Sequence, residues 1–271
     1  MQPRTARVLS AVVCLALAAA AGCSRKQSSS LTLAGSTAFQ PFAEQLAEKF
    51  MQENPGTRVT VQGGGSIVGL QALQQGAADI AMADLLALPE DILNAFSHCV
   101  VARDGLALIV HPDNPVSSVT LQQAQGIFTG EIVSWKAVGG TDSRIDVVSR
   151  EEGSGTRRSF EELVLKGKPL TKSALFQDSN GTIREAVATN PNAIGYISIG
   201  FLDARVKALK LDGIDPSNEN VIGKRYPLSR PIFLVHRTPP SPCAERFIQY
   251  VLSKEGQAII KEKGLIPVSS Q

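Results

Sequence analysis

The sequence predicts an α/β fold in two lobes, with the second lobe inserted in the first. Short runs of aliphatic and β-branched residues alternate with segments whose apolar residues recur at helical spacing. Several runs end in glycine, serine, threonine or aspartate, and in α/β proteins ligands bind at such carboxyl ends of strands. The alternation starts again near Pro115, which indicates a second unit.

The first lobe is expected to hold two helices and four strands before the chain leaves it near His111. One helix is predicted from Phe39 to Phe50, and a second begins at Ile67 and ends at Gly76. The last strand is expected to break at Asp104-Gly105. The four predicted strands are 31–34, 59–61, 78–83 and 100–110.

The second lobe is expected to follow the same alternation and to return near Val206. Its helices are predicted at 119–128, 157–165 and 183–189, and its strands at 145–148 and 193–198. Returning strands at 206–211 and 231–236 and a closing helix at 244–262 would complete the fold. The expected organisation is one lobe at 31–111 and 206–271, and the other at 112–205.

The first 22 residues have the pattern of an export signal. Arg4 and Arg7 precede an apolar run at 8–21, which is too short to span a bilayer of about 30 Å as a helix. Small residues then lead to Cys23, an order that resembles a bacterial lipoprotein signal with a lipidated cysteine and a polar tether at 23–30. Ala20 stands where leucine is usual, so an ordinary signal peptide remains the alternative.

Composition argues against nucleic acid as a partner. Residues 1–22 contain two arginines and no acid, which leaves 25 basic and 25 acidic residues in a chain with 5% aromatics. Once Cys14 and Cys23 are set aside, Cys99 and Cys243 remain, and in an oxidising compartment they form either a disulfide or two free thiols.

The segment from Arg150 to Thr156 indicates an anion site. The sequence Arg-Glu-Glu-Gly-Ser-Gly-Thr leads into a helical pattern, so backbone N–H groups, hydroxyls and a helix N-terminus would face one spot beside a guanidinium. Gly35-Ser36-Thr37 and Gly63–Ser66 are two further helix starts of this kind, and Asp84 ends a strand. Helix caps, a tight turn and an exposed loop are the structural alternatives for these residues.

Six motifs in order resemble the phosphate-binding proteins of bacterial phosphate-specific ABC transporters, the PstS family. They are Gly35-Ser-Thr37, Gly63–Ser66, Ala78–Asp84, Ile127–Trp135, Arg150–Thr156 and Gly195-Tyr-Ile197. The resemblance implies a type II periplasmic-binding-protein fold, a "Venus flytrap" that closes on one phosphate ion between its lobes. It also implies a monomer outside the cytoplasm, anchored to the membrane through Cys23, that delivers inorganic phosphate to permease subunits of the transporter.

The resemblance also assigns residues to the site. The expected phosphate ligands are Ser36, Thr37, Ala38, Ser66, Asp84, Arg150, Ser154, Gly155 and Thr156, with Glu152 orienting the arginine. A carboxylate at Asp84 would accept a proton from hydrogen phosphate but repel sulfate, which carries none at neutral pH.

Three alternatives stay open at this point. Catalysis is not expected, because Gly153-Ser-Gly-Thr156 lacks the hydrolase nucleophile motif and the three histidines form no triad or metal cluster with other residues in the sequence. The same fold could bind another oxyanion, sulfate or molybdate. Finally, phosphate capture could serve sensing without transport. No cofactor and no metal are expected.

Overall fold

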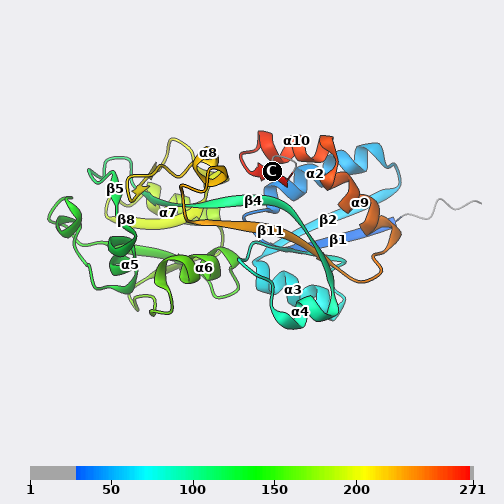
Figure 1. Ribbon diagram of the computed structural model, residues 1–271, viewed down its shortest axis with the longest axis horizontal. Helices are drawn as coiled ribbons and strands as arrows, with labels where there is room; N and C mark the ends of the chain where they lie inside the picture. Colours follow the sequence, from blue (N-terminus) through cyan, green and yellow to red (C-terminus); the bar gives the residue numbers. More distant parts are fainter. Residues whose placement is uncertain (1–28, 269–271) are drawn as a thin grey trace, which may run out of the picture.

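The structure of the protein is a computed structural model that describes residues 29–268. The expected signal at 1–22, Cys23 and most of the expected tether lie outside the described residues. Two lobes lie side by side along the long axis, and two long strands, β4 (Ser97–Val110) and β11 (Ser229–His236), run between them (Figure 1). This arrangement is the predicted two-lobed α/β fold.

Lobe 1, on the right in Figure 1, is built on the sheet order β2-β1-β3-β11-β4. β1 (Ser29–Gly35) pairs in parallel with β2 (Thr57–Gly64) and β3 (Ile80–Ala83), whereas β11 runs antiparallel to β3 and β4. Parallel neighbours place the ends of β1 and β3 at one edge, and that edge faces the other lobe.

Helices cover both faces of this sheet, which explains why its central strand is apolar throughout. Along β3, Ile80 and Met82 pack in one cluster and Ala81 and Ala83 in the other, and all four are fully buried. One face is covered by α2 (Gln40–Glu53), α9 (Pro242–Leu252) and α10 (Lys254–Glu262), and the other by α3 (Ser66–Gln75) and α4 (Glu90–Ala95). The expected closing helix is thus two helices, divided at Ser253, whose hydroxyl caps the second.

Lobe 2 continues the sheet through β8 (Ala193–Ser198), β6 (Asp146–Arg150) and β7 (Leu175–Gln177). Its larger core lies around Trp135, Phe160 and Tyr196, where the Phe160 and Tyr196 rings stack with centroids 3.9 Å apart. The helices of this lobe are α5 (Leu121–Thr129), α6 (Gly155–Phe160) with a π-helical turn at Glu161–Leu165, α7 (Asn180–Ala188) and α8 (Asn218–Ile222). Short helical turns lie at Trp135–Val138 and Ile199–Phe201, and two-residue strands form β5 (Ser118–Val119), β9 (Lys207–Ala208) and β10 (Lys210–Leu211). A further two-residue strand near the end of the chain, β12 (Ile266–Pro267), pairs with β4 at Ala102 and Arg103.

The return of the chain to lobe 1 was expected near Val206, but packing favours a later point. Leu209, Tyr226 and Leu228 belong to the core of lobe 2, and β10 pairs with β5 of that lobe. Only with β11 does the chain pair again with β3. We therefore propose that lobe 2 extends to about residue 228, because the short strands at 207–211 are too short to cross between the lobes.

The expected break at Asp104-Gly105 is absent from the fold. β4 runs through both residues, with Asp104 opposite Arg230 and Gly105 opposite Ser229 on β11. The irregularity in this pair of strands lies instead between Ile232 and Phe233. Residues 97–110 therefore form one continuous strand through the hinge. Among residues 29–268, no helix is long and apolar enough to cross a membrane.

Candidate functional site

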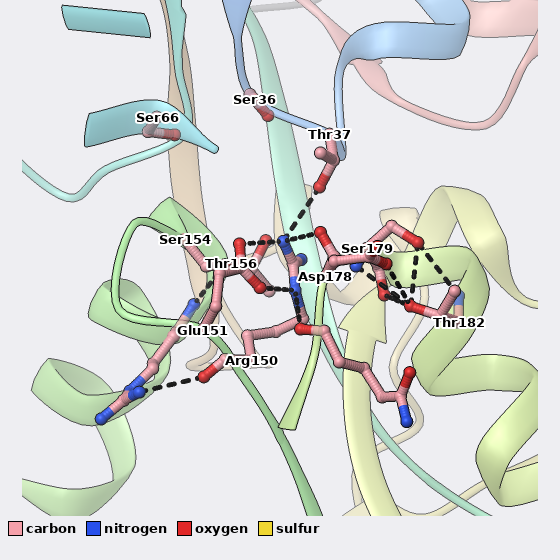
Figure 2. A network of polar contacts seen from close by, with 12 residues as sticks. Ser36, Thr37, Ser66, Arg150, Glu151, Ser154, Thr156, Asp178, Ser179 and Thr182 are labelled. Atoms are coloured by element: carbon pink, nitrogen blue, oxygen red, sulfur yellow. Dashed lines mark hydrogen bonds and ion pairs between the residues drawn. The ribbon is translucent and has the colours of Figure 1, made fainter. Parts of the chain in front are cut away.

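Three strand-to-helix connections meet where the two lobes touch. Ser36 and Thr37 follow β1, Ser66 begins α3, and Ser154 caps α6 of lobe 2. Figure 2 shows Ser36, Thr37 and Ser66 on one side and Arg150, Ser154 and Thr156 on the other. The sequence therefore predicted correctly that these segments converge.

Glycines allow this close approach of the lobes. The Ile67 N–H donates to the Gly153 carbonyl across the interface at 3.1 Å. Gly65 has a φ of 95°, and a Cβ there would lie 2.5 Å from the Gly153 oxygen. A Cβ on Gly155 would lie 2.2 Å from Ser66 Oγ and 2.3 Å from Asp84 Oδ1. Only glycine fits at these two contacts in the closed arrangement.

Arg150 supplies a buried guanidinium at the end of β6, with its side chain 1% exposed. Nε and Nη2 donate to the two carboxylate oxygens of Glu151 at 2.9 and 2.8 Å, and Nη2 also donates to the Asp178 carbonyl. Across the interface, Nη2 donates to Thr37 Oγ1 at 3.1 Å (Figure 2). Nη1 is buried and has no hydrogen-bond partner among the described residues. The guanidinium is thus fixed through Nε and Nη2 and retains Nη1 as a donor for a ligand.

Hydroxyl and N–H groups surround the arginine. Ser36 Oγ accepts from the Phe39 N–H at 3.1 Å, and Ser154 Oγ accepts from the Arg157 N–H at 3.2 Å. Both serines thus fill the local capping role that the sequence left open, yet each hydroxyl keeps its own hydrogen to donate. Within residues 29–268, the N–H groups of Thr37 and Ala38 face no protein acceptor. Such a set of donors suits an anion with several oxygens.

Asp84 lies at this junction, but protein groups bind both of its carboxylate oxygens. Oδ1 accepts from Ser66 Oγ, and Oδ2 accepts from Thr156 Oγ1 at 2.9 Å. Oδ2 also forms an ion pair with Arg230 Nη2 at 2.8 Å, and both side chains are almost completely buried. The expected role of Asp84 as a carboxylate that accepts a proton from the ligand stays a prediction, and Arg230 lies beside it as a counter-charge.

Sequence reasoning missed Arg230 and Asp104. Arg230 Nη2 also lies 3.0 Å from Asp104 Oδ2, and Ser198 Oγ donates to Asp104 Oδ1 at 2.8 Å. Burial raises the pKa of Asp104, an effect that Arg230 and Ser198 partly oppose. Each of these residues is a charged residue in a mostly apolar strand segment, where a buried charge requires a partner. This pattern is the sequence signal that could have identified the pair.

Glu152 was expected to orient Arg150, and this is wrong. Glu152 is exposed, whereas Glu151 forms the two-point contact with the guanidinium. The chain turns sharply after Arg150, with the Ser154 N–H bonded to the Glu151 carbonyl, so the next residue and not the second folds back. Sequence alone could not choose between two adjacent glutamates.

The remaining side chains that were considered have structural positions. Cys99, on β4, and Cys243, on α9, are free thiols, so the disulfide alternative is not formed in this structure. Trp135 and Tyr196 are core residues, and the Tyr196 hydroxyl forms a hydrogen bond with Ser149 Oγ at 2.8 Å, next to Arg150 on β6. In the part of the chain that the structure describes, no group of three or more His, Cys, Asp or Glu side chains is arranged to hold a metal ion.

Comparison with known proteins places this fold and site in a class of binding proteins. A model of the PBP superfamily domain matches residues 19–255. A crystal structure from Clostridium perfringens with bound phosphate, described as a phosphate ABC transporter substrate-binding protein, aligns with a TM-score of 0.85 at 39% identity over 88% of this chain and 99% of that one. An ABC-type phosphate transport receptor from Vibrio cholerae aligns with a TM-score of 0.75 at 38% identity over 88% of this chain and 100% of the other.

The phosphate-binding protein PstS of Bacillus subtilis is 36% identical over 249 residues, which are 90% of this chain and 82% of the relative. The chain therefore belongs to the PBP superfamily and, within it, to the family of PstS phosphate-binding proteins.

Proposed function

We propose that this protein binds inorganic phosphate outside the cytoplasm and delivers it to the permease of an ABC transporter. The observation that carries the proposal is the buried Arg150 guanidinium, whose Nη1 has no partner among the described residues. It lies among hydroxyl and N–H donors from both lobes, so an oxyanion bound there would contact both and favour the closed state. The family relationship supports phosphate as that oxyanion.

Titration calorimetry on the soluble chain, stripped of ligand by unfolding and refolding, tests the binding. We expect micromolar or tighter phosphate binding, and a loss of about a hundredfold in Arg150→Gln, because a charged hydrogen-bond donor inside a closed site contributes about 1.5–3 kcal/mol. Arg158→Gln is the matched control, since Arg158 is an exposed arginine on α6, the helix that follows Arg150 in the chain. Phosphate binding no tighter than millimolar would refute the proposal.

Sulfate is the competitor that the titration must include. The expected rejection of sulfate depends on the negative charge of Asp84, and Arg230 balances that charge only in part because it also pairs with Asp104. Tighter binding of sulfate than of phosphate by the parent protein would replace phosphate with a different oxyanion on the same fold.

The cellular role is transport, with no catalytic step. The PstS relatives and the Vibrio cholerae transport receptor support this role. Deletion of the gene should abolish high-affinity phosphate uptake, whereas a protein that only senses phosphate would leave uptake unchanged. Lipid attachment at Cys23 would hold the protein on the outer face of a membrane, and Cys23→Ser should then move it from the membrane fraction to the soluble fraction.

A further inference from the structure

A buried chain of charges runs through the hinge into the interlobe site. Asp104 on β4 and Arg230 on β11 are direct cross-strand partners on the two strands that connect the lobes. Arg230 is 1% exposed and Asp104 is 0% exposed. Arg230 is therefore carried by a hinge strand and not by a ligand-binding loop.

A single nitrogen of Arg230 contacts both lobes. Nη2 lies 2.8 Å from Asp84 Oδ2 in lobe 1, and it donates to Thr156 Oγ1 in lobe 2 at 3.1 Å. Asp104 Oδ2 accepts a hydrogen bond from the same nitrogen at 3.0 Å. Nη1 of the same guanidinium also donates to the Asp84 carbonyl at 3.4 Å. Arg230 thus joins Asp84 to Thr156, two of the residues expected to line the phosphate site.

These contacts determine the direction of two hydroxyl groups. The Thr156 hydroxyl donates its one hydrogen to Asp84 Oδ2 and accepts from Arg230, and the Ser66 hydroxyl donates its hydrogen to Asp84 Oδ1. A hydroxyl has one hydrogen to donate, so while it points to Asp84 the oxygen meets a ligand only as an acceptor. Asp84 can maintain this arrangement beside an anion only while a nearby cation balances its charge.

We propose that Arg230, held by Asp104, is a positioning and specificity-determining residue of the oxyanion site. It supplies the counter-charge that lets Asp84 lie beside an anion, and it sets how Thr156 and Asp84 meet when the lobes close. The inference rests on the proposed function only in taking the interlobe site to bind an oxyanion such as phosphate.

A double-mutant cycle between Arg230 and Asp84 separates this role from a merely structural one. Phosphate and sulfate are titrated into the parent, Arg230→Gln, Asp84→Asn and the double variant, and the oxyanion that the parent binds more tightly is used for the cycle. We expect Arg230→Gln to lower affinity roughly tenfold or more, because Asp84 then faces the anion without a counter-charge. In the Asp84→Asn background the same change should cost no more than about threefold.

Arg237→Gln is the matched control. Arg237 is an exposed arginine that immediately follows β11 and donates to the Leu73 carbonyl away from the site, so its replacement should leave affinity unchanged. If Arg230→Gln does not fold, Arg230→Lys enters the same cycle, because a lysine keeps the charge but has no planar fork to hold Asp84 and Thr156 together. A loss of threefold or more that shrinks in the Asp84→Asn background supports the proposal.

The outcomes distinguish the two proposals. Equal losses in both backgrounds, or no loss on changing Arg230, would overturn the role of Arg230 while leaving phosphate binding intact. If the parent prefers sulfate, the phosphate assignment fails and the cycle with sulfate still decides the role of Arg230. If the parent binds neither anion, both proposals fail.

Discussion

Gly155→Ala should separate lobe closure from folding. A Cβ at this position would lie 2.2 Å from Ser66 Oγ and 2.3 Å from Asp84 Oδ1, both in the opposite lobe. Ordinary contact needs about 3.4 Å or more, so the lobes would have to separate by about 1 Å at this point. Gly155 is the first residue of α6, and alanine is a better helix former than glycine, so lobe 2 itself should fold normally.

The magnitude follows from the interlobe bonds that such a separation would lengthen. They include the Thr156–Asp84 bond at 2.9 Å, the Arg150–Thr37 bond at 3.1 Å and the Ile67–Gly153 bond at 3.1 Å. At a net value of about 1 kcal/mol each, their loss costs about 3 kcal/mol of closure, which corresponds to roughly a hundredfold weaker phosphate binding.

The assay is titration calorimetry for affinity, together with small-angle scattering for closure and thermal unfolding for stability. Gly181→Ala is the control, because a Cβ there meets only Ser179 Oγ at 3.7 Å. We expect Gly155→Ala to bind weakly and stay open with phosphate while its unfolding temperature is unchanged or raised. Parent-like affinity, within about threefold, would show that the lobes do not close on this contact and would refute the reasoning.

Three further predictions concern individual side chains. Glu151→Gln should weaken phosphate binding roughly tenfold by calorimetry because it loosens Arg150, whereas Glu152→Gln should have no effect, and the reverse order would contradict the assignment. Burial raises the pKa of the Cys99 thiol to about 11, so at pH 8 it should react with a thiol reagent far more slowly than after unfolding, and mass spectrometry of unreduced protein should find Cys99 and Cys243 free. Burial raises the pKa of Tyr196 from 10.0 to about 12, so the tyrosine of the unfolded chain ionises first and the free energy of unfolding should fall as the pH rises between those values. In denaturant titrations, Tyr196→Phe should reduce this fall, and the same dependence on pH as in the parent would contradict the prediction.

Local sequence patterns predicted much of the fold. The helix from Ser66 ends at Gly76 as predicted, because a glycine there adopts the left-handed conformation that terminates a helix, with φ 79°. The glycine and hydroxyl residues after β1 and before α3 and α6 indicated an anion site because their chemistry is local to each helix start. Their convergence followed from the rule that ligands bind at the carboxyl ends of strands.

Contacts between residues that are distant in the sequence determined the features that local patterns did not predict. Asp104 in an Asp-Gly pair predicted a break by its local propensity, but Arg230, which is 126 residues away, holds it inside a continuous strand. Arg230 also changes the electrostatic environment of Asp84, because its buried guanidinium lies beside the carboxylate that is expected to face the anion. The choice of Glu151 over Glu152 depended on a turn whose direction only the folded chain defines.

The sequence by itself determined which segments form helices and strands, which loops carry anion-binding groups, and the family to which those motifs belong. These properties depend on residues that are neighbours in the chain, so periodicity and loop composition report them. The tertiary structure alone decided the charge balance of the site, since Asp84, Asp104 and Arg230 meet only when the hinge strands pair and the lobes close. Electrostatic energy depends on separation in space, and the order of residues in the chain does not contain that distance.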